Sequence, residues 1–475
     1  MSVKATSGVK HIDEKRPLLT RLSDEIWEYA EVGLHEDRSA KALEDALEAE
    51  GFRVDRGVVG MPTAFVGTWG AGSPVIGFLG EYDALPGVSQ CATPTPQELK
   101  AGAAGHGCGH NLLGVGALAG AIGLAKELQS RNLPGTVKYF GCPAEENFSG
   151  KAFMARDGLF DDLDICMTWH AGSLNRVRNG SSLANNAMNV TFYGRTAHAA
   201  GDPYNGRSAL DALQLMNLGV EFLREHMSSK ARVHYVITNG GGQPNVVPAK
   251  ASAWYLVRAP QRSEVDDLYK RVLNCACGAA QMTDTRAEIE LIKAIWNMLS
   301  NSVVEDVLEE SAKRVGPPKF SEADFEFARE IAKSFNPGQV EAQLRKEDVP
   351  EEVFSQVLNT TWLPRPATPK DGEGSTDVSD ASWCCPTAEF RVACQAIGTP
   401  GHSWQYAAQS GMSIGHEGMI VAGKILAEAG LEFATNPALI EKAKAEFAKS
   451  TGGKKYVSAI PKDHKPKFDQ FDKHN

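Results

Sequence analysis

The sequence carries no excess of positive charge. Its 49 Lys and Arg residues are outnumbered by 59 Asp and Glu, which gives a net charge of −10 over 475 residues. A surface that binds nucleic acid or anionic lipid needs clustered positive charge. We therefore expect neither nucleic acid nor a membrane among the partners of this chain.

Long apolar segments are also missing. The longest apolar run, residues 112–125, contains four glycines and is shorter than the ~20 residues that a transmembrane helix requires. The N-terminus lacks the apolar core of a signal peptide. These absences predict a cytoplasmic protein.

The cysteines do not form a recognisable framework. There are nine, an odd number, and none of them belongs to a C-x-x-C pair. This pattern disfavours both a set of disulfides and a zinc ribbon. Most of the cysteines are expected to be small buried residues, and Cys108 is the exception.

The composition is that of a large folded protein, with 42% apolar and 23% charged residues. Strand-like apolar runs at 75–79, 136–142 and 165–169 alternate with helical periodicity before residue 50 and at 112–129. This alternation predicts an α/β fold, in which helices flank a mostly parallel sheet. Ligands of such folds usually bind at one edge of the sheet.

A different pattern occupies residues 186–299, where the expected order of elements is β-α-β-β-α-β. This is the order of the α+β ferredoxin-like unit. We predict that it is a dimerisation or lid domain inserted into a discontinuous catalytic domain of residues 1–185 and 300–475. The charged segment 300–375 contains many prolines and glycines and predicts two or three helices, and the last 25 residues are expected to form a loose tail.

Four short motifs hold side chains that bind metals or transfer protons. They are HGCGHN, PAEEN, MTWHAG and TPGHSW, which contribute Cys108, His110, Glu145, Glu146, His170 and His402. Each motif alone is weak, because a histidine at a strand end or a cysteine in a loop usually has a structural role. All four, however, adjoin predicted strands and can therefore converge at one sheet edge. A thiolate, three imidazoles and a carboxylate form a set that binds Zn²⁺ or Mn²⁺.

Taken together, the motifs resemble the amidohydrolase branch of the aminoacylase/glutamate-carboxypeptidase metallopeptidase family. The resemblance covers residues 20 to 430 and rests on GEYDALPG, GHGCGHN, GTVKYFGCPAEEN, TWHAG, GRTAHAA, NVVP and HSW. It implies two divalent metal ions per subunit, Zn²⁺ or Mn²⁺. The implied ligands are Cys108, His110, Glu146, His170 and His402. Glu145 matches the general acid/base of the family.

The same resemblance implies a metal-dependent amidohydrolase that cleaves the amide bond of an N-acyl or N-aroyl amino acid with metal-activated water. The expected small-molecule substrate is similar to p-aminobenzoyl-glutamate or is an aromatic acyl conjugate of aspartate or glutamate. His198 of the inserted domain would reach across a homodimer, while Asn245 and Arg258 would hold the substrate carboxylate, which suits a guanidinium. A related second subunit is a further expected partner.

The chain departs from the family pattern at several positions. Glu81 stands where carboxypeptidase-like relatives have the histidine of an H-x-D motif, so Cys108 is expected to supply the missing ligand. Asp83 and Asn111 are expected to contact the ligand side chains without binding the metal themselves. Asp377 and Asp380 are further candidates for such a role. Structural roles are expected for the remaining singled-out histidines, which are His106, His416, His464 and His474.

Three alternatives remain open at this point. The same two-metal centre would serve a dipeptidase, and only the size of the pocket separates the two enzymes. A hydrolase with Cys108 as its nucleophile would leave the other motif residues unexplained. A non-catalytic metal-dependent scaffold would have no need of Glu145. The choice between Zn²⁺ and Mn²⁺ also stays open, because Cys108 favours Zn²⁺ while carboxylate and imidazole ligands accept both.

Overall fold

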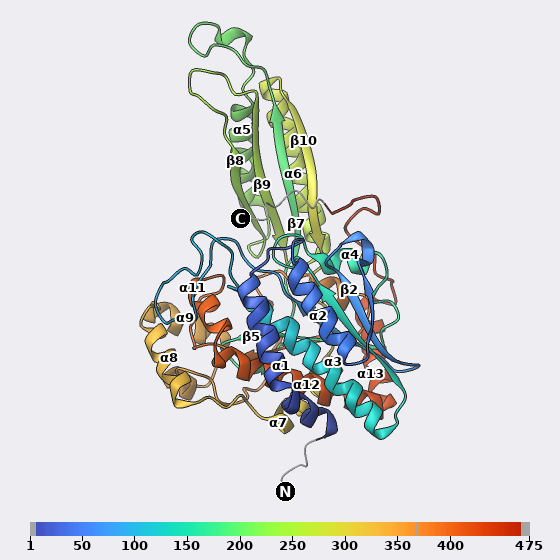
Figure 1. The fold of residues 1–475 in the computed structure, drawn as a ribbon. Coiled ribbons are helices and arrows are strands. Elements are labelled where there is room, and N and C mark those ends of the chain that lie inside the picture. The colour runs from blue at the N-terminus through green and yellow to red at the C-terminus, as the bar shows by residue number, and fades with distance from the viewer. Residues whose placement is uncertain (1–5, 367, 467–475) are drawn as a thin grey trace.

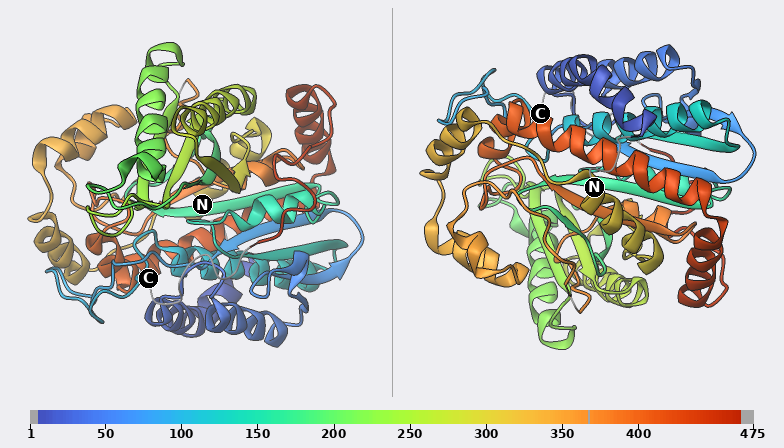
Figure 2. Two further views of the ribbon diagram at one scale, coloured as in Figure 1. Left: turned by 90° about the horizontal axis from the view of Figure 1, so that it is seen from above. Right: turned by 90° about the horizontal axis from the view of Figure 1, so that it is seen from below.

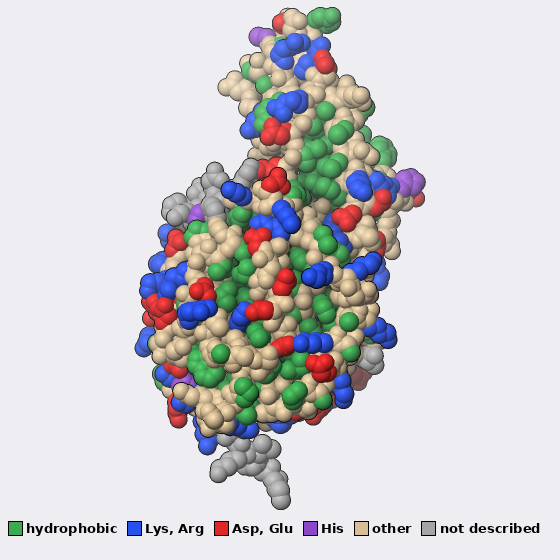
Figure 3. All heavy atoms as spheres, turned by 90° about the vertical axis from the view of Figure 1, so that its right-hand side faces the viewer, with side chains coloured by type: hydrophobic (Ala, Val, Ile, Leu, Met, Phe, Trp, Pro, Cys, Tyr) green, Lys and Arg blue, Asp and Glu red, His purple; other side chains and the backbone are tan. Residues whose placement is uncertain are grey.

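The computed structural model describes residues 6–366 and 368–466. A broad body carries a long arm that projects from one side (Figure 1). In the side view of Figure 3 the arm is a narrow extension of the body. The arm corresponds to the middle of the chain, and the body is formed by the segments before and after it.

The body is built on a seven-stranded sheet. The four central strands are parallel, and the other three pair antiparallel at the two edges. In spatial order the strands are β1 (Arg53–Arg56), β2 (Phe65–Ala71), β4 (Gly135–Cys142), β3 (Val75–Glu81), β5 (Ile165–Gly172), β11 (Thr387–Ala393) and β6 (Arg176–Val177). The α/β fold with a mostly parallel sheet is therefore confirmed.

Both faces of this sheet are covered, which explains the continuous apolar runs of its central strands. Phe78 and Tyr139 point into one core, and their chain neighbours Leu79 and Phe140 point into the other. Figure 2 shows the helices α1, α3 and α12 lying along the first face. The helices of the N-terminal half of the body are α1 (Ser7–Tyr29), α2 (Asp37–Ala49), α3 (His110–Arg131) and α4 (Gly150–Arg156).

Helix α3 is the centre of the first core. Its glycines permit close contact, since a Cβ at Gly116 would lie 2.5 Å from the Trp169 ring and one at Gly120 would lie 2.6 Å from Leu426. The helix is long and apolar enough to cross a membrane, but 94% of its most apolar window is buried inside the body. A core helix passes the same test of length and composition.

The C-terminal half of the body is helical apart from β11. The three helices within 302–347 agree with the two or three expected there. The helices of this half are α7 (Ser302–Val315), α8 (Glu322–Ala332), α9 (Pro337–Glu347), α10 (Val378–Ser382), α11 (Trp404–Ser410), α12 (Ser413–Thr435) and α13 (Pro437–Thr451). Short 3-10 turns occur in the chain at 58–60, 203–205, 224–226 and 351–355.

The arm contains a four-stranded antiparallel sheet in the order β10-β7-β9-β8. Helices α5 and α6 cover one face of it and form a separate core with alternate strand residues. The elements follow the expected β-α-β-β-α-β order and are β7 (Ala184–Tyr193), α5 (Ala209–Leu223), β8 (Arg232–Asn239), β9 (Lys250–Ala259), α6 (Arg262–Thr283) and β10 (Arg286–Ile295). The chain enters and leaves the arm on neighbouring strands, because β7 pairs with β10.

The expectation of a loose C-terminal tail is wrong for the residues that the structure describes. The Tyr456 hydroxyl lies 2.5 Å from Oδ1 of the buried Asp380, and the indole of Trp296 donates to the carbonyl of Val457 at 3.0 Å. Ile460 is buried in the second core. A few apolar side chains are enough to fix a segment that is polar on average. The tail thereby joins the base of the arm to the body.

We expect Tyr456→Phe to lower the free energy of unfolding by about 1–2 kcal/mol, because the buried Asp380 would lose a hydrogen-bond partner. Urea denaturation followed by circular dichroism measures this change. Tyr204→Phe is the matched control, since Tyr204 is 88% exposed. Equal stability of the two variants would contradict the packing of the tail.

Candidate active site

The four motifs meet at the carboxyl ends of the parallel strands. Glu81 ends β3, the Glu145–Glu146 pair follows β4, and His170 lies near the end of β5. Cys108 lies two residues before His110, the first residue of α3. His402 follows β11 and donates its backbone N–H to the carbonyl of Gly107 at 3.0 Å, so its loop is tied to the cysteine loop.

One group of possible metal ligands consists of Cys108, His110 and His170. Their ligand atoms all lie within 4.8 Å of one another. Cys108 Sγ is 3.6 Å from His170 Nε2, which is a usual separation for two ligands of one tetrahedral ion. His110 Nε2 is buried and has no hydrogen-bond partner among the described residues.

A second group consists of Cys108, Glu146 and His402. His402 Nε2 lies 3.4 Å from Glu146 Oε1, and this oxygen is buried without a hydrogen-bond partner in the described part of the chain. Because Cys108 belongs to both groups, its sulfur lies between them. Buried polar atoms without a hydrogen bond are costly, and the two found here, His110 Nε2 and Glu146 Oε1, fit a site that binds cations.

The carboxylate of Asp83 joins the two groups. One oxygen accepts from His110 Nδ1 at 2.8 Å, and the other accepts the backbone N–H of Glu146 at 3.0 Å. Burial alone would raise the pKa of Asp83, but the charge and hydrogen bond of His110 bring it below its ordinary value. The structure thus places Asp83 behind a proposed ligand, as expected.

Asn111 does not have the position expected from the sequence. Its amide donates to Ser23 Oγ at 3.0 Å and to the Ser410 carbonyl at 2.9 Å. One step along α3 turns this side chain away from the cluster of His110, toward α1 and the end of α11. Asn111 therefore connects helices and does not contact a proposed ligand through these bonds.

Glu145 lies beside these two groups on a strained turn, and it forms a third group of close ligand atoms with Glu81 and His110. The preceding Ala144 has φ = 57°, a conformation that L-residues rarely adopt. Its backbone N–H donates to the buried Glu36 at 2.8 Å, which holds the turn in place. Burial raises the pKa of Glu145, and the carboxylates of Glu81 and Glu146 raise it further. No motif pointed to Glu36, which lies 108 positions before Ala144.

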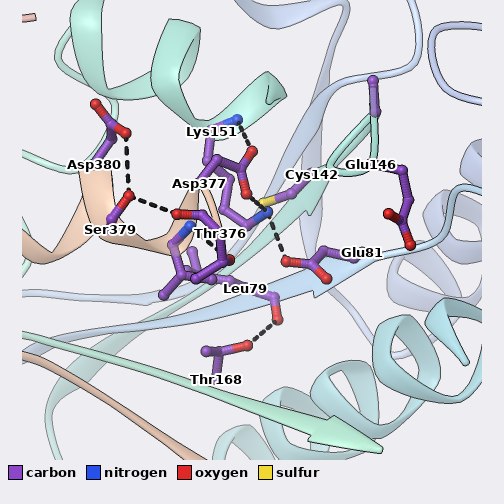
Figure 4. A network of polar contacts seen from close by, with 12 residues as sticks. Leu79, Glu81, Cys142, Glu146, Lys151, Thr168, Thr376, Asp377, Ser379 and Asp380 are labelled. Carbon is purple, nitrogen blue, oxygen red and sulfur yellow. Dashed lines mark hydrogen bonds and ion pairs between the residues drawn. The ribbon is translucent and has the colours of Figure 1, made fainter. Parts of the chain in front are cut away.

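A buried charge network lies behind Glu145. Figure 4 shows Lys151 of α4 pointing between Asp377 and Glu81, with Glu146 beyond Glu81. Lys151 Nζ is 2.5 Å from Asp377 Oδ1 and 2.7 Å from Glu81 Oε1, and Lys151 and Asp377 are fully buried. The second Glu81 oxygen lies 3.2 Å from His110 Nε2. Asp377 thus pairs with a lysine that no sequence motif indicated, whereas Asp380 contacts the C-terminal tail.

The remaining histidines have structural positions. Burial lowers the pKa of His106 to about 3, and its Nε2 lies 3.0 Å from the carbonyl of Ile26. His416 pairs with Asp24 at 2.8 Å, and His464 lies 3.3 Å from the carbonyl of Ile292. His474 lies outside the described residues.

The geometry disfavours Cys108 as a nucleophile. A reactive cysteine needs a thiolate stabilised by a nearby cation. Burial raises the pKa of the Cys108 thiol. Burial, with a contribution from His110, lowers the pKa of His170 to about 4. Both shifts disfavour the thiolate–imidazolium pair that a cysteine nucleophile would form with His170.

A cavity of about 1050 Å³ opens above the two ligand groups and continues to the base of the arm. Arg258, near the end of β9, lies in its wall, and its Nε is buried without a partner among the described residues. Arg258 therefore reaches the site from within its own chain.

His198 and Asn245 are not near this cavity. Both are exposed. His198 lies in the loop after β7 and Asn245 in the loop between β8 and β9, and Figure 1 shows these loops at the far end of the arm. From Lys250, the first residue of β9, to Arg258 the strand alone spans about 26 Å. Within one chain Asn245 and Arg258 therefore lie too far apart to bind the same carboxylate, and their joint role stays a prediction.

Comparison with known proteins agrees with this architecture. Residues 185–276 match the peptidase dimerisation domain of M20 peptidases. One subunit of the p-aminobenzoyl-glutamate hydrolase of Escherichia coli (strain K12) is 41% identical over 468 residues, which cover 96% of this chain and 97% of the relative. The chain belongs to the M20 peptidase family. This confirms the resemblance of the motifs, which within the family points to this hydrolase. It also confirms the prediction of an enzyme that hydrolyses amide bonds.

Two further relatives of this M20 chain bear on its chemistry. An Xaa-Arg dipeptidase of Mus musculus is 30% identical over 455 residues, which cover 93% of this chain and 91% of the relative. The crystal structure of a dinuclear metal-binding M20 peptidase of Bacillus subtilis has a TM-score of 0.55 at 17% identity and covers 89% of this chain and 99% of that one. The latter shows a common fold.

Proposed function

We propose that this chain is a metal-dependent amidohydrolase that removes an aromatic acyl group from an amino acid. The observation that carries the proposal is the pair of ligand groups that share Cys108 beside the half-buried Glu145. The body would be the catalytic domain, formed by residues 1–185 and 300–475. The arm, residues 186–299, would be the dimerisation and lid domain.

Two divalent cations, Zn²⁺ or Mn²⁺, would be held by these groups. The residues that would hold them are His110, His170, Glu146, His402 and Cys108, and Cys108 belongs to both ligand groups. Asp83 would fix the orientation of His110 through its hydrogen bond to Nδ1. Bound ions of this kind supply an activated water and polarise the carbonyl that it attacks.

Glu145 would transfer the proton in this reaction. Its raised pKa suits a group that takes a proton from water and then donates it to the leaving nitrogen. The strained Ala144 and its hydrogen bond to Glu36 hold Glu145 at the cavity. Arg258 would hold the carboxylate of the amino acid, since its guanidinium has no ion-pair partner among the described residues.

The substrate that fits best is p-aminobenzoyl-glutamate or a similar aromatic acyl conjugate of aspartate or glutamate. This follows the printed name of the Escherichia coli relative. Cleavage of a dipeptide that ends in arginine, as named for the mouse relative, fits less well. Arg258 and the buried Lys293 at the base of the arm would repel a cationic product.

The active form would be a homodimer assembled through the arm, with a related second subunit as the alternative partner. Strand β8 is an unpaired edge of the arm sheet and carries the exposed Val236 and Ile237. The neighbouring α5 exposes Leu218 and Phe222, the latter at 70%. An edge with apolar side chains favours pairing with a second copy. His198 of one chain would then approach the cavity of the other.

The proposed compartment is the cytoplasm. All nine cysteines lie in the described residues and none forms a disulfide. Unpaired cysteines in this number are typical of a reducing environment.

Dialysis against a chelator is expected to abolish hydrolysis of p-aminobenzoyl-glutamate, and added Zn²⁺ or Mn²⁺ is expected to restore it. The reason is that the proposed ligands include every motif residue except Glu145, to which the proton transfer is assigned. Activity and metal content by mass spectrometry are measured on the same samples. An enzyme that uses Cys108 as its nucleophile would keep full activity without metal.

Glu145→Gln is expected to lower kcat by about 10²–10⁴-fold while metal content stays unchanged, because the amide cannot accept a proton. Glu146→Gln is the matched substitution and should instead lower metal content, since Glu146 Oε1 faces His402. Metal loss in the first variant and not in the second would reverse the two assignments.

Co-expression of Glu145→Gln with His198→Ala chains is expected to recover activity that neither variant has alone. With random pairing, half of the dimers are mixed and each holds one intact site, so recovery approaches about a quarter of wild type. His226→Ala, on an exposed histidine of the same arm, is the control and should stay active by itself. Mixed dimers without activity would show that His198 does not act in trans.

A further inference from the structure

The base of the arm presents positive charge to the cavity on the sheet face that α5 and α6 leave open. The register of the strands defines which residues share this face. Arg258 of β9 lies opposite Asn185 of β7, which lies opposite Ile295 of β10. Two residues further along β7, and so on the same face, Ala187 lies opposite Lys293 of β10. The strands β9 and β10 flank β7 and are therefore about 10 Å apart.

Several cations around this cavity already have a carboxylate partner, and Arg176 and Arg232 donate to backbone carbonyls. Arg178 pairs with Glu389 at 3.2 Å, Lys346 with Glu373 at 2.5 Å, and Lys230 with Asp371 at 3.7 Å. These pairs lie at the solvent side or between body segments. They are satisfied without a ligand.

Lys293 differs from them in burial and in pairing. It is 7% exposed, and its one described side-chain hydrogen bond goes to the backbone carbonyl of Glu146 at 3.4 Å. No carboxylate of the described residues pairs with it within 4.0 Å, and the same holds for Arg258. A buried lysine and a half-buried arginine on one sheet face, both without an ion pair among the described residues, form a site for anions.

We propose that Lys293 binds a second carboxylate of the substrate, so that the enzyme selects N-acyl derivatives of the dicarboxylic amino acids glutamate and aspartate. This assignment rests on the proposed function, in which Arg258 holds the α-carboxylate. A side-chain carboxylate can then reach Lys293 while the amide bond faces Glu145. The contact of Lys293 with the Glu146 carbonyl places the ammonium beside the reacting centre.

The charges around Lys293 are consistent with this role. Burial lowers the pKa of Lys293, while the carboxylate of Glu145 opposes the shift and Arg258 reinforces it. A substrate carboxylate would offset both the burial and the repulsion from Arg258. A neutral side chain on the substrate would leave the ammonium without a partner, and this loss is the source of the selectivity.

The test compares two substrates of nearly equal shape, p-aminobenzoyl-glutamate and p-aminobenzoyl-glutamine. Their ratio of kcat/KM measures recognition of the side-chain carboxylate alone. Wild type is expected to favour glutamate by roughly tenfold to a hundredfold, the value of one charge-assisted hydrogen bond. Lys293→Met should remove this preference by lowering kcat/KM for glutamate, and Lys293→Arg should keep part of it.

Three controls make the outcome decisive. Lys346→Met replaces a lysine that is 61% exposed and already paired, and it should leave the ratio unchanged. Arg258→Met should lower kcat/KM for both substrates alike, because both carry the α-carboxylate. Arg391→Met replaces an exposed cavity cation without an ion pair in the described residues and should leave the ratio unchanged.

Several results would overturn the proposal. An equal loss for both substrates in Lys293→Met would assign Lys293 to the support of the Glu145–Glu146 turn. Loss of the preference in Arg391→Met, and not in Lys293→Met, would move the contact to Arg391. A wild-type ratio near one would show that no side-chain carboxylate is recognised. If wild type cleaves neither substrate, the proposed function itself fails, which is a separate outcome.

Discussion

The carboxylate of Asp83 is the contact on which the organisation of the site depends. It holds the ring of His110 with one oxygen and the backbone of Glu146 with the other. His110 begins α3, and Glu146 follows β4, so one side chain fixes a helix start relative to a strand end. This bridge therefore fixes the position of one ligand group relative to the other. A carboxylate at this place is effective because its two oxygens accept independently.

The site concentrates more negative charge than its own residues neutralise. Glu81, Asp83, Glu145, Glu146 and Asp377 lie close together in the interior, and Lys151 is the cation between two of them. Buried carboxylates without partners are unfavourable. The excess of carboxylates favours divalent cations. The buried His110 Nε2 and Glu146 Oε1, which have no hydrogen bond among the described residues, favour them as well.

The two ends of the arm sheet present different residues. Its base carries Arg258 and Lys293 into the cavity of the same chain. Its tip carries His198 and Asn245 into solvent, and its edge strand β8 exposes apolar side chains. A rigid antiparallel sheet can serve both ends because its strands are long and straight enough to hold them apart.

The sequence alone determined the fold class and the residue types of the centre. Apolar runs that are buried on both faces, and motifs that adjoin them, follow from local pattern, so the convergence of Cys108, Glu146, His170 and His402 could be predicted. The tail of residues 452–466 could not, since its average polarity hides the few side chains that pack. Hydrogen bonds between residues far apart in the chain could not be predicted either, such as those of Glu36 with Ala144 and of Lys151 with Asp377.

The directions in which side chains point were decided only by the tertiary structure. His110 and Asn111 are neighbours in the sequence, yet one helical step of about 100° turns one toward the cluster and the other toward α1. Asn245 and Arg258 belong to one predicted domain, but the length of β9 places them at opposite ends. Lys293 appears in the sequence as one lysine in a strand, and only the register of β10 against β7 puts it on the face of Arg258. Local pattern specifies what each residue can do, and the tertiary structure decides which residues share a site.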